Sequence, residues 1–128
     1  MIKLKLFSIL IFLLVCGCAS TGNKTLGSFD SAQVTTMIKD GVTTKQEIVA
    51  MLGDPSGIDL DHQSREKWTY THQKVTSKAI NFVPIAGSFQ RGTNNTVKQL
   101  IILFDSNNVV SKHIFSTSLS ETNIGLLG

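Results

Sequence analysis

The feature that most constrains the fold of this 128-residue chain is a pair of strand-like runs joined by a short polar connector. The runs are residues 97–104 (VKQLIILF) and 109–116 (VVSKHIFS), and residues 105–108 (DSNN) join them. Asp and Asn favour turns because their side chains hydrogen-bond to nearby backbone and tolerate left-handed angles. We therefore expect the two runs to form an antiparallel hairpin.

A third strand is expected at residues 65–73 (REKWTYTHQ), where side-chain types alternate. Trp68, Tyr70 and His72 would lie on one face and the intervening residues on the other, which is the period of a half-buried strand. Together with the hairpin, this strand predicts a three-stranded antiparallel meander. His72 and His113 both fall in these strands and could face each other across the sheet.

Two helices are expected before the strands. A first helix can start at Asp30 or Ser31 and run through Lys39, and a second can start from the capping box of Thr44 and Glu47. Helices followed by strands give an α+β order. We therefore predict an α+β fold with two N-terminal helices packed on one face of a three-stranded antiparallel sheet.

The N-terminal segment, MIKLKLFSILIFLLVCGC, has the layout of a secretory signal, with a basic start, an apolar core and small residues before a cleavage point. Its apolar run is shorter than the roughly 20 residues that span a bilayer. Residues 15–18 (VCGC) resemble a bacterial lipobox, which predicts removal of residues 1–17 as a lipoprotein signal peptide and acylation of Cys18 by chains such as palmitate. The alternative is an ordinary signal peptide in which the cysteine is incidental.

The residues after the anchor bear on location. Ala19 and Ser20 follow Cys18, so Asp is missing from the position directly after the cysteine. In lipoproteins of double-membrane bacteria, this pattern resembles that of proteins released to the outer membrane. We therefore predict a lipid-anchored protein at the periplasmic face of the cell outer membrane, with outer-membrane lipid as a partner through the anchor. Residues 18–28 are mostly small and polar, and we expect a flexible tether there.

Charge argues against one class of partner. The formal net charge is +3, but Lys3 and Lys5 belong to the signal segment, so the rest of the chain is nearly neutral. The rest contains no block of Lys and Arg, and we expect no nucleic-acid partner. Both cysteines, Cys16 and Cys18, precede the predicted domain, so the domain must be stable without a disulfide.

Motifs for catalysis are missing from the sequence. His62, His72 and His113 lie far apart and have no His or Cys partner at metal-ligand spacing. The acidic pair Asp59 and Asp61 beside His62 is interpreted as a solvated connector. We expect no catalytic residues, no metal site and no cofactor apart from the covalent lipid, so the protein is predicted not to be an enzyme.

A long segment, residues 74–96, separates the first strand from the hairpin, where two to five residues would suffice. Its apolar side chains either contact lipid or a protein partner, or fold back over the domain's own core, and both alternatives stay open. Residues 117–128 show no clear period and are expected to form a loose C-terminal tail. The candidate contact residues of the long loop are Ile80, Phe82, Val83, Ile85 and Phe89.

Residues 41–55 (GVTTKQEIVAMLGDP), the Trp68-Thr69-Tyr70 run and residues 103–110 (LFDSNNVV) resemble the BamE (SmpA/OmlA) family of small outer-membrane lipoproteins. The resemblance covers residues 29–116. It implies a BamE-like domain of two helices on a three-stranded antiparallel sheet. It also implies an accessory role in the machinery that inserts β-barrel proteins into the outer membrane, with contacts to a lipoprotein partner and to anionic lipid.

In that family the contact surface lies along and just after the Trp-x-Tyr strand, so the resemblance points to Trp68 and Tyr70 as partner-binding residues. The chain departs from the family pattern at His72-Gln73, which stands in place of an aromatic residue followed by arginine, and in its long loop. Both departures concern the partner and not the fold.

Two functional hypotheses follow. The first is a non-catalytic, protein-binding scaffold that supports outer-membrane barrel assembly or envelope integrity. The second is an inhibitor or exclusion-type periplasmic binding module on the same fold. The expected protein partners are therefore β-barrel assembly components or another envelope protein.

Overall fold

The structure is a computed structural model, and it describes residues 19–78 and 90–125. The predicted signal segment and the predicted lipidation residue Cys18 lie outside the described residues, and so do the predicted contact residues of the long loop: Ile80, Phe82, Val83, Ile85 and Phe89.

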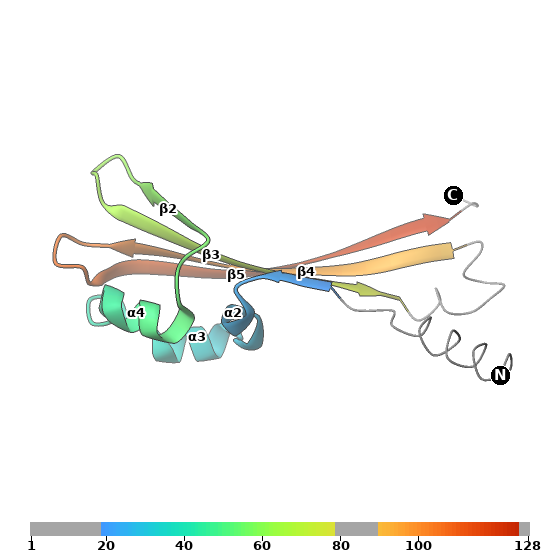
Figure 1. The fold of residues 1–128 in the computed structure, drawn as a ribbon, viewed down its shortest axis with the longest axis horizontal. Coiled ribbons are helices and arrows are strands. Elements are labelled where there is room, and N and C mark those ends of the chain that lie inside the picture. Colours follow the sequence, from blue (N-terminus) through green and yellow to red (C-terminus); the bar gives the residue numbers. More distant parts are fainter. Residues whose placement is uncertain (1–18, 79–89, 126–128) are drawn as a thin grey trace, which may run out of the picture.

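The described chain forms an antiparallel sheet with short helices along one face (Figure 1). The helices are α2 (Lys24–Ser28), α3 (Ser31–Met37) and α4 (Lys45–Leu52). The strands are β1 (Ala19–Gly22), β2 (Gly57–Leu60), β3 (Glu66–Ser77), β4 (Gln90–Phe104) and β5 (Val110–Gly125).

The sheet is larger than the predicted three-stranded meander. Strands β3, β4 and β5 are neighbours in chain order, as expected, but β1 and β2 both add to the outer edge of β3. Strand β2 pairs with the first part of β3 (Ile58 opposite Trp68), and β1 pairs with a later part (Ala19 opposite Val75). The prediction of two helices on three strands is therefore wrong, because one long edge strand has room for two short partners.

Residues 19–28, expected to be a flexible tether, are part of the fold. Asn23 caps α2 by accepting from the backbone N–H of Leu26 at 2.8 Å, and its Nδ2 donates to the carbonyl of Leu52 at 2.6 Å. Lys98 Nζ donates to the carbonyls of Gly27 and Phe29 at 2.7 and 2.6 Å. Leu26 is fully buried. A single apolar side chain is enough to fix this segment because polar contacts tie both ends of the helix.

The C-terminal tail and part of the long loop also belong to the sheet. Strands β4 and β5 stay paired until Gln90 lies opposite Gly125, and β3 pairs with β4 until Ser77 lies opposite Thr93. These stretches are rich in Ser, Thr and Asn because they extend beyond the helices, where no core demands apolar side chains (Figure 1). Apolar side chains therefore do not alternate along these stretches, although their backbones pair regularly with the neighbouring strands.

The two predicted helices and the predicted turn are confirmed. Asp30 and Gln33 form a capping box on α3, and Thr44 and Glu47 form one on α4. In the turn between β4 and β5, the Asp105 carboxylate accepts the backbone N–H groups of residues 107 and 109 at 2.8 and 3.1 Å. These elements were predictable because each rests on a short polar motif that acts locally.

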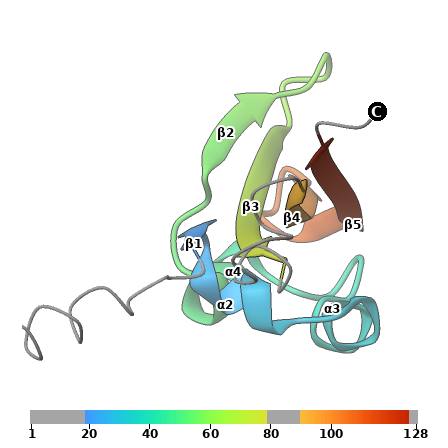
Figure 2. The same ribbon diagram turned by 90° about the vertical axis from the view of Figure 1, so that its right-hand side faces the viewer.

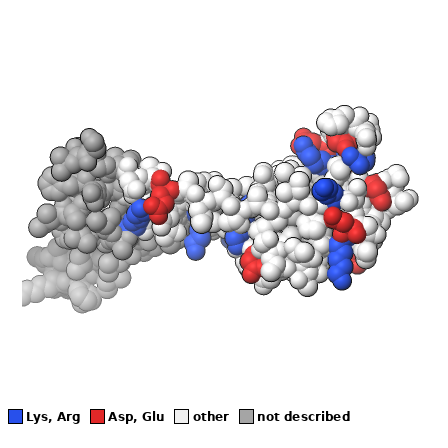
Figure 3. Space-filling view, turned by 180° about the vertical axis from the view of Figure 1, so that it is seen from behind, with Lys and Arg blue, Asp and Glu red and all other residues white. Residues whose placement is uncertain are grey.

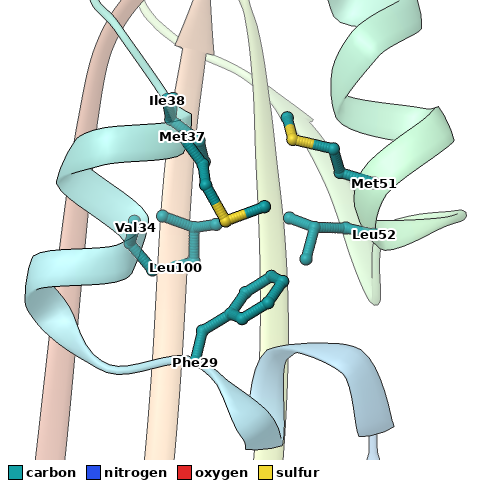
Figure 4. A pocket seen from close by; sticks show the side chains of 7 residues that line it. All are labelled: Phe29, Val34, Met37, Ile38, Met51, Leu52 and Leu100. Atoms are coloured by element: carbon teal, nitrogen blue, oxygen red, sulfur yellow. The ribbon is translucent and has the colours of Figure 1, made fainter.

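The core lies between the helices and one face of the sheet, and Figure 2 shows the helices beneath that face. Side chains from α3 and α4 meet Phe29 and Leu100 there and leave a gap of only about 10 Å³ (Figure 4). This apolar space has room for about one water molecule, so it is a packing gap and not a ligand site. The buried apolar residues are Leu26, Val34, Ile38, Ile48, Leu52, Trp68, Tyr70, Leu100, Ile102, Phe104 and Val110.

Candidate functional site

The aromatic pair predicted to contact a partner is part of the core. Trp68 is 6% exposed and Tyr70 is 0% exposed, because the alternation of β3 points both toward the helices. Tyr70 Oη donates to the carbonyl of Gly53 at 2.8 Å, and burial, with a smaller contribution from Asp54, raises the pKa of Tyr70 to about 12. In this structure the two side chains therefore lie in the core, and their role in partner contact stays a prediction.

Trp68 is held in place from several sides. Its ring meets Phe104 edge to face with centroids 4.9 Å apart, and its Nε1 donates to Glu66 at 2.9 Å. Lys45 Nζ lies 5.5 Å from the centroid of the Trp68 ring and 2.9 Å from the same Glu66 oxygen. Hydrogen bonds from Lys45 and then Trp68 lower the pKa of Glu66. These contacts fix the end of β3 against α4.

The histidines do not form a site. His72 is buried against Gly27, and its Nδ1 has no hydrogen-bond partner in the described part of the chain. His113 Nδ1 lies 2.6 Å from Asp40 Oδ1, and His62 is exposed. His72 lies opposite Lys98 in the sheet register and His113 lies opposite Ile102, so the two do not face each other. Among residues 19–78 and 90–125, no His, Cys, Asp and Glu side chains gather as a metal site.

A hollow lies on the sheet face that points away from the helices. We call it the sheet trough, and its volume is about 460 Å³. In Figure 2 this face lies between the hairpin of β2 and β3 on one side and β5 on the other. Its lining residues are Leu60, Asp61, His62, Arg65, Lys67, Ile101, Leu103, Lys112 and Ile114.

Strand alternation supplies the apolar floor of the trough. Leu100 and Ile102 of β4 are buried against the helices, so Ile101 and Leu103 between them point to the opposite face. Ile114 of β5 lies directly opposite Ile101 and is 56% exposed. The floor therefore exposes branched apolar side chains from two neighbouring strands.

The wall of the trough is the turn between β2 and β3, and a carboxylate organises it. Asp61 accepts the backbone N–H groups of Gln63 and Arg65, both at 2.9 Å. The Arg65 guanidinium donates two further bonds to Asp61 Oδ2, at 2.9 and 2.7 Å. These hydrogen bonds, chiefly those from Arg65, lower the pKa of Asp61 to about 2.

The rim of the trough carries positive charge. Lys67 and Lys112 line it, and Lys67 lies 3.4 Å from the exposed carboxylate of Asp59. Lys112 has no ion-pair partner among the residues that the structure describes. Figure 3 shows charged side chains concentrated over this end of the molecule. The trough thus combines an apolar floor with lysine ammonium groups at its border.

The sequence contained a signal for the trough that the strand prediction did not use. Residues 101–104 are four apolar side chains in succession, and a strand with such a run has apolar side chains on both faces. The helices cover one face of this run, and on the other face the described residues leave Ile101 and Leu103 half-buried.

Comparison with protein-family models, with curated proteins and with solved structures finds no match for the chain. Within the described ranges, none of the helices has the length and apolar character needed to cross a membrane.

Proposed function

We propose that the protein is a non-catalytic lipoprotein at the periplasmic face of the outer membrane, and that the sheet trough binds a segment of an envelope protein. The single observation that carries the binding proposal is the apolar floor around Ile101, Leu103 and Ile114, which the described residues leave partly exposed. Apolar side chains that share one exposed hollow are favourable to cover, because burial removes them from water.

The anchor in this proposal is the lipid on Cys18. Cys18 directly precedes Ala19, the first residue of β1, so acyl chains on Cys18 would hold this end of the sheet close to the bilayer. Two or more acyl chains give stable attachment without a spanning segment. The membrane partner in this account is the outer-membrane lipid itself.

The chemistry of the trough favours a segment with apolar side chains flanked by carboxylates. Ile101 and Leu103 would cover the apolar side chains, and Lys112 and Lys67 would face the carboxylates. Charge complementarity at such a rim mainly sets partner choice and association rate, whereas the apolar floor supplies affinity.

For the cellular role, we propose support of β-barrel assembly or of envelope integrity. The sequence motifs of residues 41–55 and 103–110 favour this role, because they resemble those of the BamE family. The second candidate is an inhibitor or exclusion-type binding module, which the departure at His72-Gln73 favours. Sequence alone also keeps the apolar side chains from Ile80 to Phe89 as proposed contacts to lipid or a protein partner.

Affinity purification of the full-length chain from membranes in mild detergent tests the proposal. Ile114→Glu places a carboxylate on the trough floor and should abolish recovery of the partner. The matched control is Ile58→Glu, because Ile58 is 58% exposed against 56% for Ile114 but lies outside the trough. Equal recovery with both variants would contradict binding in the trough.

The identity of the recovered protein separates the two roles. Recovery of a β-barrel assembly component, together with increased outer-membrane permeability after gene deletion, supports the scaffold. Failure to recover any such component counts against it. Normal permeability with recovery of a different periplasmic protein favours the inhibitor-type module.

A further inference from the structure

Strand β5 forms one edge of the sheet, and most of that edge is unpaired. It lies last in the strand order, with β4 as its neighbour on the inner side. On its outer side, Val110 exchanges backbone hydrogen bonds with Gly41 and Thr43, at 2.6 and 2.8 Å. Beyond Val110, no backbone hydrogen bond reaches this side within the described part of the chain. The outer edge therefore offers a long row of free donors and acceptors.

This edge lacks the usual features that prevent strand addition. Residues 114–120 (IFSTSLS) contain no proline and no charged side chain. The register irregularity of the β4–β5 ladder lies between Leu103 and Phe104, near its start. The opposite edge of the sheet differs, since β1 and β2 cover much of β3. Natural sheets commonly blunt exposed edges with charge, proline or bulges, so an edge without them is suited to pairing.

We infer that this edge binds a second copy of the chain, with the two β5 strands paired antiparallel and Thr117 opposite Thr117 of the second copy. A two-fold axis perpendicular to the sheet leaves each residue on its own face, and directly opposed residues must share a face. The paired residue numbers must therefore sum to an even value, which excludes every register centred between two residues.

Side-chain chemistry selects the register centred on Thr117. It places Phe115 opposite Leu119 of the second copy, and His113 opposite Glu121 of the second copy. The two-fold axis repeats each of these pairs, so both occur twice in the dimer. Leu119 is 76% exposed and gains an apolar partner. His113 uses Nδ1 for Asp40, which leaves Nε2 to face Glu121 of the second copy, whose carboxylate also lies 3.2 Å from Lys78 of its own chain. Apolar pairs and opposite charges across strands stabilise pairing.

The neighbouring allowed registers lose both matches. A centre at Ser116 places His113 opposite Leu119 of the second copy and Phe115 opposite a threonine. A centre at Ser118 places Phe115 opposite Glu121 of the second copy. Each puts a polar or ionisable side chain against an apolar one, so neither gives the complementarity of the register at Thr117. This interface is separate from the trough, which lies on a face and not on the edge.

Disulfide trapping of the full-length chain in mild detergent tests the register. Thr117→Cys should give a band of twice the monomer mass after mild oxidation, and reduction should remove it. The matched control is Thr122→Cys, an exposed threonine on the same strand. In this register its two copies lie about 33 Å apart, so it should stay at the background of the parent chain. Equal trapping of both variants, or a disulfide to a protein of another mass, would overturn the proposal.

Light scattering of the untrapped chain tests the pairing without a new cysteine. Leu119→Lys should raise the dimer dissociation constant about tenfold, since two apolar cross-strand pairs are lost. Ile58→Lys is the control, because Ile58 is 58% exposed on β2 at the other edge of the sheet and lies outside the trough. A monomeric parent chain, or equal weakening by both substitutions, would overturn the proposal.

Discussion

Ala19 lies opposite Val75 in the antiparallel pairing of β1 with β3, so the residue that follows the predicted lipidation site is already part of the sheet. The trough residue Lys67 lies eight residues away from Val75 along β3. At the rise of a strand, this separation is about 26 Å. An anchor at Cys18 would therefore present the trough away from the bilayer, where an envelope protein can reach it.

The first prediction concerns the segment expected to be a tether. Leu26→Ala should lower the free energy of unfolding by about 2–5 kcal/mol, because Leu26 is fully buried and its removal leaves a cavity. Urea unfolding of the full-length chain in mild detergent measures this loss. A flexible tether would give no change, which would contradict the packing of α2.

A second prediction concerns the entry of β1 into α2. Gly22 has φ +85°, and an added Cβ would overlap the carbonyl oxygen of Thr71. Gly22→Ala should therefore cost on the order of 1–3 kcal/mol. Gly41→Ala is the control with a similar φ of +77° but nothing within 4 Å of the added atom, and it should cost about 1 kcal/mol. Equal losses in thermal unfolding would argue against close contact between β1 and β3.

The third prediction tests whether Tyr70 and Trp68 belong to the core. Tyr70→Phe removes the hydrogen bond to Gly53 and should cost about 1 kcal/mol. Trp68→Ala removes a buried ring and should cost about 3–5 kcal/mol. Denaturant midpoints measure both effects. If either substitution abolished partner recovery while stability stayed unchanged, the aromatic pair would be a contact surface after all.

The fourth prediction is a pH dependence at the wall of the trough. The pKa of Asp61 lies at about 2 in the folded chain against an ordinary value of 3.8, so its ionised form stabilises the fold above about pH 4. This stabilisation is lost as the pH falls through the folded pKa. Asp61→Asn should therefore lower the melting temperature at pH 7, and the difference should close between about pH 4 and pH 2.

Asp59→Asn provides the control for that series. It removes the same charge from the same hairpin, but Asp59 makes only an exposed contact to Lys67 at 3.4 Å. Exposed ion pairs contribute little, so the melting temperature should barely change at any pH. A difference for Asp61→Asn that persists below pH 2 would show that the carboxylate charge is not what holds the turn.

Local motifs explain which parts of the fold could be predicted from the sequence. The capping residues Asp30 and Thr44 and the turn residue Asp105 act on backbone within a few positions, and the structure has all three in these roles. Asn23 is a helix cap of the same kind, but only Leu26 follows it as an apolar signal, so the composition of residues 18–28 favoured a tether.

Long-range pairing explains the parts that could not be predicted. The Ser- and Thr-rich part of β5 shows no apolar alternation, and its strand character depends on hydrogen bonds to β4. For the candidate site, the alternation of β3 correctly placed Trp68 and Tyr70 on one face but did not say that helices cover that face. The opposite face is the candidate binding site because the pairing of β4 with β5 brings Ile101 and Ile114 together in one hollow.

A photo-crosslinking amino acid placed at Ile114 in living cells tests whether the trough binds an envelope protein. Ile58, with nearly the same exposure, is the control position. We expect a discrete adduct between the chain and one envelope protein from position 114, and none from position 58. No adduct from position 114, or the same adduct from both positions, would contradict it.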